Sequence, residues 1–165
     1  MIHGNTYQEA SDYAHQIAEE KKLVYVGSFH SERFFAGNAT IMLEIIEDNP
    51  EIDTVIAPIG GGGLMAGISF AAKKINPNIK IYGVQAEGCS SMYQSLKENH
   101  PVTIENAHTI ADGVAVRRPS DLSYSYVKEY MDDMFLVSDQ DIKKAVTLLH
   151  SKAKLVTEGA GAAAT

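Results

Sequence analysis

The sequence of 165 residues has a single cysteine, no tryptophan and no apolar stretch long enough to span a bilayer. A lone cysteine excludes an internal disulfide and is typical of a reducing cytoplasm. Basic residues are also scarce, because 14 lysines and arginines stand against 21 acidic residues, a formal net charge of −7. Since no basic stripe appears, we expect a cytoplasmic protein that binds neither nucleic acid nor membrane.

Patterns for metal binding or nucleophilic catalysis are missing as well. The six histidines are scattered without the spacing of a metal site. Cys89 is followed by two serines and has no obvious activating base, which argues against a nucleophilic thiol. Asp132 and Asp133 are adjacent, so on a strand they face opposite sides, and we expect both to be solvated.

The most informative feature that is present is a run of four glycines, Gly60 to Gly63. An apolar run at 54–58 precedes the glycines, and apolar residues at helical spacing follow them. The glycines therefore lie at a strand-to-helix turn, where backbone N–H groups and the positive end of a helix bind anions. Residues without a Cβ let the backbone wrap closely around a phosphate. The run is neither a Walker A loop nor Gly-x-Gly-x-x-Gly, so a mononucleotide and a phosphorylated cofactor both stay open.

Strand-like and helix-like segments alternate along the chain, which favours a parallel sheet with helices on its faces. The periodicity predicts strands over 23–26, 54–58, 79–84 and 134–137, and helices over 6–20, 35–47, 64–75, 91–98, 121–130 and 139–151. The last of these helices has its cap at Ser138 or Asp139. A further helix starts after Thr157 and stops within about one or two turns. A domain rarely ends where a helix begins, so we expect a piece of a longer domain.

Three other patterns have ordinary structural interpretations when each is taken alone. Asp112-Gly113 is a common turn, and Glu158-Gly159 suits the start of a helix. Glu87, at the end of a predicted strand, is by default a solvated carboxylate. Their joint presence with the glycine run favours a functional interpretation.

In order and spacing these motifs resemble the threonine ammonia-lyase (threonine dehydratase) and serine racemase family of fold-type II pyridoxal-phosphate enzymes. The resemblance runs from Ile2 to Ala164 and includes Gln85-Ala86-Glu87-Gly88, the segment from Thr109 to Pro119, and Val156 to Ala162. Their Ala-Glu-Gly, Ala-Asp-Gly and Glu-Gly-Ala-Gly versions resemble the threonine ammonia-lyase branch more than serine racemase. The resemblance implies an α/β three-layer sandwich with a mostly parallel sheet, similar to the tryptophan synthase β-subunit, of which this chain is an incomplete part.

The resemblance also implies which residues bind the cofactor, pyridoxal 5′-phosphate. The phosphate would be cradled by Gly60, Gly61, Gly62 and Gly63 with the N–H of Leu64, while Gly113 would lie near the cofactor ring and Glu158 near its pyridine side. Glu87 matches a glutamate that ligates a divalent cation in some members. Because residues 88–92 lack the second carboxylate of those members, we predict no metal site.

The same resemblance predicts two domains in the chain and shows where its sequence differs from the family's motifs. Residues 1–25 would be the last helix and strand of a small domain, and residues 26–165 a part of the large cofactor-binding domain. Ala39 stands where the family usually has the second glycine of Ala-Gly-Gln-Gly-Thr. The family's Schiff-base lysine lies upstream of the matched region, and no lysine here matches its motif. We therefore predict no catalytic residue in this chain.

For the full-length protein, the resemblance implies a homo-oligomer that deaminates L-threonine to 2-oxobutyrate and ammonia, with L-serine, giving pyruvate, as a second substrate. This chain alone is expected to be inactive. Two alternatives stay open: a non-catalytic fragment or pseudoenzyme subunit that binds a phosphate-bearing ligand, and a serine racemase or serine dehydratase. An upstream segment with the family's lysine, in the same polypeptide or in a partner chain, would favour the enzyme.

Overall fold

The computed structural model describes residues 2–4 and 7–165. Its sheet contains three parallel strands, β1 (Thr54–Pro58), β2 (Lys80–Ala86) and β3 (Asp133–Val137), in the order β1-β2-β3. The register pairs Thr54 with Lys80 and Tyr82 with Asp133. The parallel sheet predicted from the alternation of segments is therefore confirmed.

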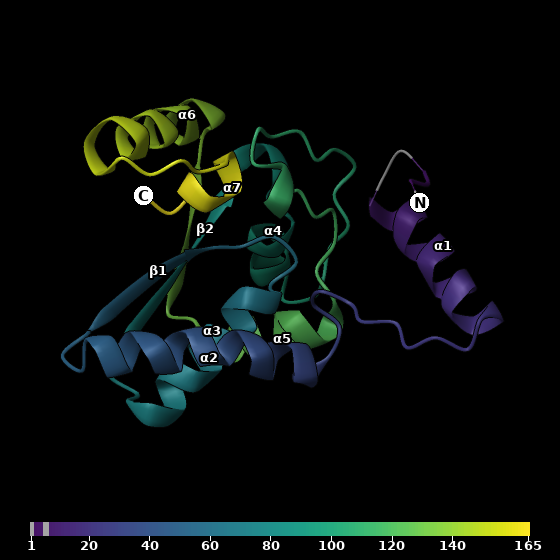
Figure 1. Cartoon of the computed structure of the whole chain (residues 1–165), viewed down its shortest axis with the longest axis horizontal. Helices are drawn as coiled ribbons and strands as arrows, with labels where there is room; N and C mark the ends of the chain where they lie inside the picture. The colour runs from purple at the N-terminus through teal and green to yellow at the C-terminus, as the bar shows by residue number, and fades with distance from the viewer. Residues whose placement is uncertain (1, 5–6) are drawn as a thin grey trace.

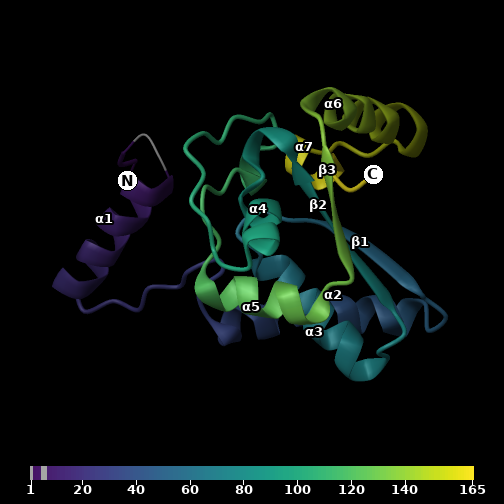
Figure 2. The ribbon, with the colours of Figure 1, turned by 180° about the vertical axis from the view of Figure 1, so that it is seen from behind.

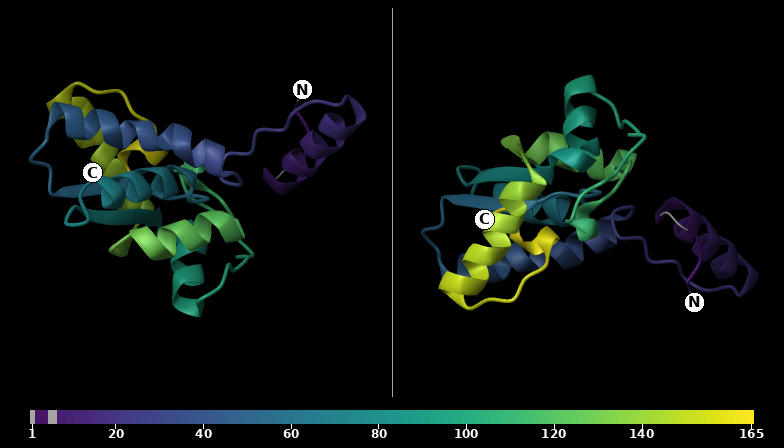
Figure 3. Two further views of the ribbon diagram at one scale, coloured as in Figure 1. Left: turned by 90° about the horizontal axis from the view of Figure 1, so that it is seen from below. Right: turned by 90° about the horizontal axis from the view of Figure 1, so that it is seen from above.

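Helices lie on both faces of this sheet (Figure 1). α2 (Glu32–Asp48), α3 (Gly63–Ile75) and α5 (Asp121–Tyr130) form a layer beside one face, as the view from below in Figure 3 shows. On the other face lie α6 (Asp139–Leu148) and the short α7 (Gly159–Ala162). The remaining helix of the body, α4 (Ser91–Glu98), follows β2 through the short turn Glu87–Cys89. This is the predicted three-layer α/β arrangement.

The two faces of the sheet are covered to different extents. On the face toward α3 and α5, Val55, Ala57 and Ile81 are buried in the main core. On the opposite face, α6 and α7 pack against Ala86 and Val137 in a smaller cluster. Further along that face, Ile56 remains 52% exposed and Phe135 50% exposed. One face is thus packed and the other partly bare.

Serine caps start three of these helices. Ser31, Ser120 and Ser138 each accept a hydrogen bond on the side-chain oxygen from the N–H three residues further along. Such caps satisfy donors that have no partner within the helix. Ser138 is one of the two caps predicted for the 139–151 helix. That helix ends earlier than predicted, because a π-helical turn, Leu149–Ala153, follows α6.

The strand predicted over residues 23–26 is wrong. This segment has no regular structure, and Leu23, Val24 and Val26 are 59%, 89% and 73% exposed. A strand needs a neighbour to bind its N–H and C=O groups, and no strand in the described part of the chain pairs with it. The preceding helix, α1 (Tyr7–Glu20), lies apart from the sheet (Figures 1 and 2). Its predicted start at Thr6 lies outside the described residues, and the domain boundary near residue 25 stays a prediction.

Candidate functional site

The four glycines and Leu64, here called the glycine loop (Gly60 to Leu64), connect β1 to α3 at the carboxyl edge of the sheet. The N–H of Ile59 donates to the Val84 carbonyl at 2.8 Å, so strand pairing continues up to the residue before the loop. Gly62 has a φ of 92°, a left-handed conformation that L side chains rarely adopt. α3 begins at the next residue, Gly63. The predicted strand-to-helix turn is therefore present at these glycines.

The N–H groups of the glycine loop are available to a ligand. Those from Gly60 to Leu64 donate no hydrogen bond to any residue that the structure describes, whereas Ala66 donates to the Gly62 carbonyl at 2.8 Å. Gly61, Gly62 and Gly63 are buried, and a buried donor without an acceptor costs about 1–3 kcal/mol. The dipole of α3 adds partial positive charge at the same place. Several unpaired donors at a helix start fit an anion with several oxygens, such as a phosphate group.

The absence of side chains at the four glycines also lets the surrounding protein pack closely on this loop. A Cβ on Gly61 would meet the ring of Phe29, and a Cβ on Gly63 would meet the Ser28 carbonyl. A Cβ on Gly60 would lie 2.9 Å from Cα of Val114. The explanation from sequence, close wrapping around a phosphate, is therefore incomplete. The glycines also let two remote segments pack against the loop.

One of these segments is the Asp-Gly loop, defined here as Thr109 to Arg117, with a short 3-10 turn at Asp112–Val114. A Cβ on Gly113 would lie 3.2 Å from Oε1 of Glu158, the residue that precedes α7. Val114, the next residue, makes the contact with Gly60. The structure thus brings Gly113 and Glu158 together and joins them to the glycine loop. Their contacts with a cofactor ring stay a prediction.

Polar side chains that sequence reasoning missed hold both loops in place. Ser123 Oγ donates to the Gly61 carbonyl at 2.6 Å, and Ser120 Oγ donates to the Phe29 carbonyl. Asp139, at the start of α6, accepts hydrogen bonds from Thr109 Oγ1 at 2.6 Å and from the Ile110 N–H at 3.1 Å. The sequence marked Ser138 or Asp139 as a cap, but no sequence signal linked these side chains to the loops.

Cys89 is inert in this structure. Its side chain is fully buried, and burial raises the pKa of the thiol to about 11. The neutral thiol donates to the Val116 carbonyl at 3.4 Å. Glu87 is exposed, and the described residues contain no group of three or more His, Cys, Asp or Glu side chains that could hold a metal ion. Among the same residues, no helix is both long and apolar enough to cross a membrane.

Asp132 is exposed, as predicted, but its carboxylate is also paired with two lysines, which the sequence did not indicate. Its carboxylate lies 2.6 Å from Lys73 Nζ and 3.0 Å from Lys80 Nζ, and it accepts the Ile81 N–H at 2.9 Å. Partial desolvation acts to raise the pKa of Asp132, but these three donors outweigh it and lower the pKa to about 2. The cluster connects α3 to the start of β2, at the end of the sheet opposite the glycine loop.

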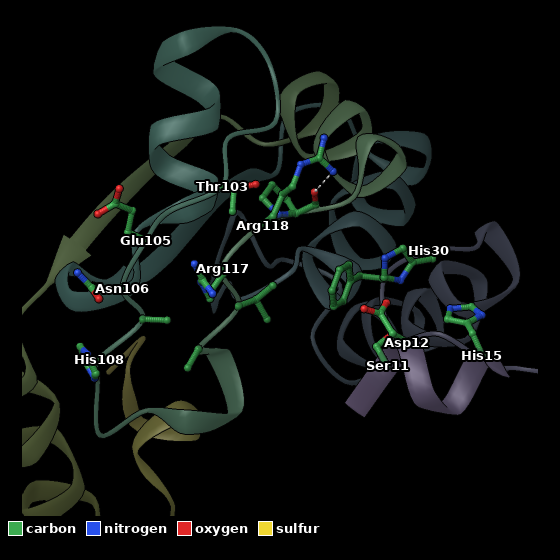
Figure 4. Close-up of a pocket in the computed structure, with 15 residues that line it drawn as sticks. Ser11, Asp12, His15, His30, Thr103, Glu105, Asn106, His108, Arg117 and Arg118 are labelled. Carbon is green, nitrogen blue, oxygen red and sulfur yellow. Dashed lines mark hydrogen bonds between the residues drawn. The ribbon is translucent and has the colours of Figure 1, made fainter. Parts of the chain in front are cut away.

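A cavity of about 750 Å³ lies beside the glycine loop, between α1 and the segment that leads into the Asp-Gly loop (Figure 4). Phe29, which packs on Gly61, is part of its wall, as are Ala115 and Val116. Figure 4 shows Arg117 on one side of the cavity and His30 on the other. Burial and the nearby His15 lower the pKa of His30, and Arg117 Nε donates to the Ile104 carbonyl at 3.0 Å. The cavity therefore has polar groups in its wall and shares Phe29 with the packing around the glycine loop.

A parallel sheet that presents unpaired N–H groups at a helix start is an arrangement that many α/β proteins use to bind phosphate groups. The family model described as "Pyridoxal-phosphate dependent enzyme" matches residues 1–165, and the chain belongs to this family. The resemblance found in the sequence motifs is therefore confirmed, and with it the dependence of the family on pyridoxal phosphate.

Curated relatives and solved structures agree with this assignment. The chain is 43% identical to an L-threonine ammonia-lyase of Thermotoga maritima, over 98% of this chain and 40% of the relative. It is 40% identical to a catabolic L-threonine dehydratase of Escherichia coli, over 99% of this chain and 50% of the relative.

Among solved structures, maize serine racemase superimposes with a TM-score of 0.94 at 32% identity, over 99% of this chain and 51% of that one. Processed threonine deaminase isoform 2 from Solanum lycopersicum superimposes with a TM-score of 0.93 at 36% identity, over 99% of this chain and 48% of that one. The chain thus spans about half the length, or less, of the proteins that it matches.

Proposed function

We propose that this chain forms the cofactor-phosphate site of a pyridoxal-phosphate-dependent threonine ammonia-lyase. The complete enzyme converts L-threonine to 2-oxobutyrate and ammonia, and L-serine to pyruvate and ammonia. The observation that supports the site most directly is the set of unpaired N–H groups in the glycine loop, three of them on buried glycines. The names of the relatives, L-threonine ammonia-lyase and L-threonine dehydratase, support the reaction.

The residues present here bind and orient the cofactor. When bound, pyridoxal phosphate supplies an electron sink for the bonds at the substrate Cα. The N–H groups from Gly60 to Leu64 would hold its phosphate, while Gly113 and Glu158 would border the ring. The carboxylate of Glu158 lies beside Gly113, where no side chain separates the two.

Removal of the substrate's Cα proton needs a base, which we assign to a lysine outside these 165 residues. Lys73 is bound to the carboxylate of Asp132 at 2.6 Å, at the end of the sheet away from the glycine loop. Lys144 pairs with Asp141 at 2.9 Å on the exposed side of α6. We therefore propose that the chain alone is inactive. From the family resemblance we also propose that residues 1–25 belong to a small domain completed elsewhere.

An absorbance titration of the chain with pyridoxal 5′-phosphate tests the cradle. We expect saturable binding of pyridoxal 5′-phosphate. Pyridoxal, which lacks the phosphate, should bind at least about tenfold more weakly, because the charged acceptor for the loop N–H groups is lost. Equal affinity for both compounds would refute a phosphate site. Borohydride reduction followed by peptide mass mapping tests the missing lysine, and stoichiometric labelling of a single lysine would refute that part of the proposal.

The high TM-score with maize serine racemase keeps that reaction as a second candidate. In the polypeptide or complex that includes the lysine, 2-oxobutyrate from L-threonine supports the ammonia-lyase, and D-serine from L-serine supports the racemase. With the chain alone we expect neither product. A homo-oligomeric full-length enzyme and a cytoplasmic location stay predictions.

A further inference from the structure

The turn between β2 and α4, residues Gly88 to Ser91, lies directly against the Asp-Gly loop and the residue before it. The N–H of His108 donates to the Gly88 carbonyl at 3.0 Å, and a Cβ on Gly88 would collide with the His108 carbonyl. Ser91 Oγ donates to the Val116 carbonyl at 2.6 Å, and Cys89 Sγ donates to the same oxygen. This turn therefore holds the Asp-Gly loop near both of its ends.

The donors of these contacts are buried, and their acceptor, the Val116 carbonyl, belongs to a half-buried residue. Ser91 and Cys89 have no exposed surface. A half-buried carbonyl that loses its donor costs free energy, so the Ser91 hydroxyl favours one position of Val116. The thiol at 3.4 Å is a weak donor and cannot replace the hydroxyl.

The position of Val116 is linked to the glycine loop through Val114. The N–H of Val116 donates to the Val114 carbonyl at 2.9 Å, and the N–H of Ala115 donates to the Asp112 carbonyl at 3.0 Å. Val114 in turn packs so closely on Gly60 that a Cβ there would lie 2.9 Å from its Cα and 3.0 Å from its carbonyl oxygen. Val116 is therefore connected to the first donor of the glycine loop through Val114, by one hydrogen bond and one close packing contact.

We propose that Ser91 is a positioning residue for the phosphate site. Its hydroxyl holds the Val116 carbonyl, which keeps Val114 against Gly60 and the loop N–H groups in their binding arrangement. The effect on cofactor affinity rests on the proposed function. The effect on the order of the Asp-Gly loop does not, because it needs no ligand.

The test compares Ser91→Ala with Ser95→Ala in the 165-residue chain. Ser95 is equally buried on the same helix, donates to the Ser91 carbonyl at 2.7 Å and accepts the Val102 N–H at 2.9 Å, but does not contact Val116. For Ser91→Ala we expect amide hydrogen exchange in residues 111–117 to accelerate about tenfold without ligand, and the Kd for pyridoxal 5′-phosphate to rise about 5- to 10-fold. Ser95→Ala should leave both quantities within about twofold.

The readouts separate the possible failures. Unchanged exchange at 111–117 in Ser91→Ala would overturn the inference, whatever the cofactor does. Faster exchange with an unchanged Kd would overturn the positioning role. If wild-type chain does not bind pyridoxal 5′-phosphate, the proposed function fails, while the exchange data still decide whether Ser91 orders the loop. Should Ser91→Ala not fold, Ser91→Cys keeps a weak donor and must give an intermediate exchange rate for the inference to stand.

Discussion

The glycine loop and the Asp-Gly loop meet where Gly60 touches Val114, yet they are built in different ways. The glycine loop takes its shape from its own residues: a strand before it, a helix after it and a left-handed Gly62 between them. The Asp-Gly loop has little regular structure, and side chains from α4 and α6 hold it. A local sequence pattern is enough for the first loop, whereas the second requires the folded protein around it.

This difference predicts how each loop fails. A change inside the glycine loop should remove phosphate binding directly, because the donors themselves are displaced. A change at Ser91 or Asp139, which hold the Asp-Gly loop, should affect phosphate binding only indirectly. Its effect on the free energy of unfolding should be larger than its effect on cofactor affinity. The following substitutions test that contrast.

The largest effect is expected for Gly62→Ala. A Cβ there would lie 2.7 Å from Cε of Met92, and the φ of 92° is unfavourable for alanine. We expect a loss of about 3 kcal/mol in the free energy of unfolding and about 100-fold weaker binding of pyridoxal 5′-phosphate. Chemical denaturation and absorbance titration measure the two effects.

Gly37→Ala is the matched control for this substitution. Gly37 lies within α2, and a Cβ there would meet nothing within 4 Å. Alanine should stabilise the helix by about 0.5–1 kcal/mol and leave the affinity for the cofactor unchanged. If Gly62→Ala behaved like Gly37→Ala, the conformation of the glycine loop would not matter for binding.

Asp139→Ala breaks the support of the Asp-Gly loop. The substitution removes the acceptor of Thr109 Oγ1 and of the Ile110 N–H, so we expect a loss of about 2 kcal/mol in unfolding free energy. Cofactor affinity should fall only a few-fold, since Ser91 still holds the other end of the loop. Gln140→Ala, at the exposed next position, should change neither quantity. A larger loss of affinity than that of Gly62→Ala would reverse the contrast between the two loops.

The same contrast explains what the sequence could predict. The glycine loop and the cap at Ser138 were predictable, because spacing within a few residues determines them. The strand over residues 23–26 was predicted wrongly, because a strand also depends on a neighbour that the local pattern does not reveal. Ser123 was missed because it binds a carbonyl 62 positions away, and Ser91 because its acceptor is 25 positions away. Single serines in such places look like any surface serine until the fold brings their partners close.

The smallest effect, and the one that separates stability from binding, is expected for Asp132→Asn. Asp132 binds Lys73 and Lys80 far from both loops, so its loss should cost about 1 kcal/mol, after allowance for solvent screening, and leave cofactor affinity unchanged. The pKa of the folded Asp132 is lowered to about 2, below its unfolded value. The stabilisation is therefore fully present above about pH 4 and disappears as the pH falls toward 2.

Urea denaturation of wild type and Asp132→Asn between pH 2 and 7 checks this sign. The two free energies should converge at the acid end and differ at neutral pH, while Asp133→Asn, at the exposed next residue, follows wild type throughout. A difference that grew toward low pH would mean that the carboxylate is not held in its charged form by the two lysines. A change in cofactor affinity would mean that this end of the sheet is coupled to the glycine loop after all, and that the two loops are not the only determinants of the site.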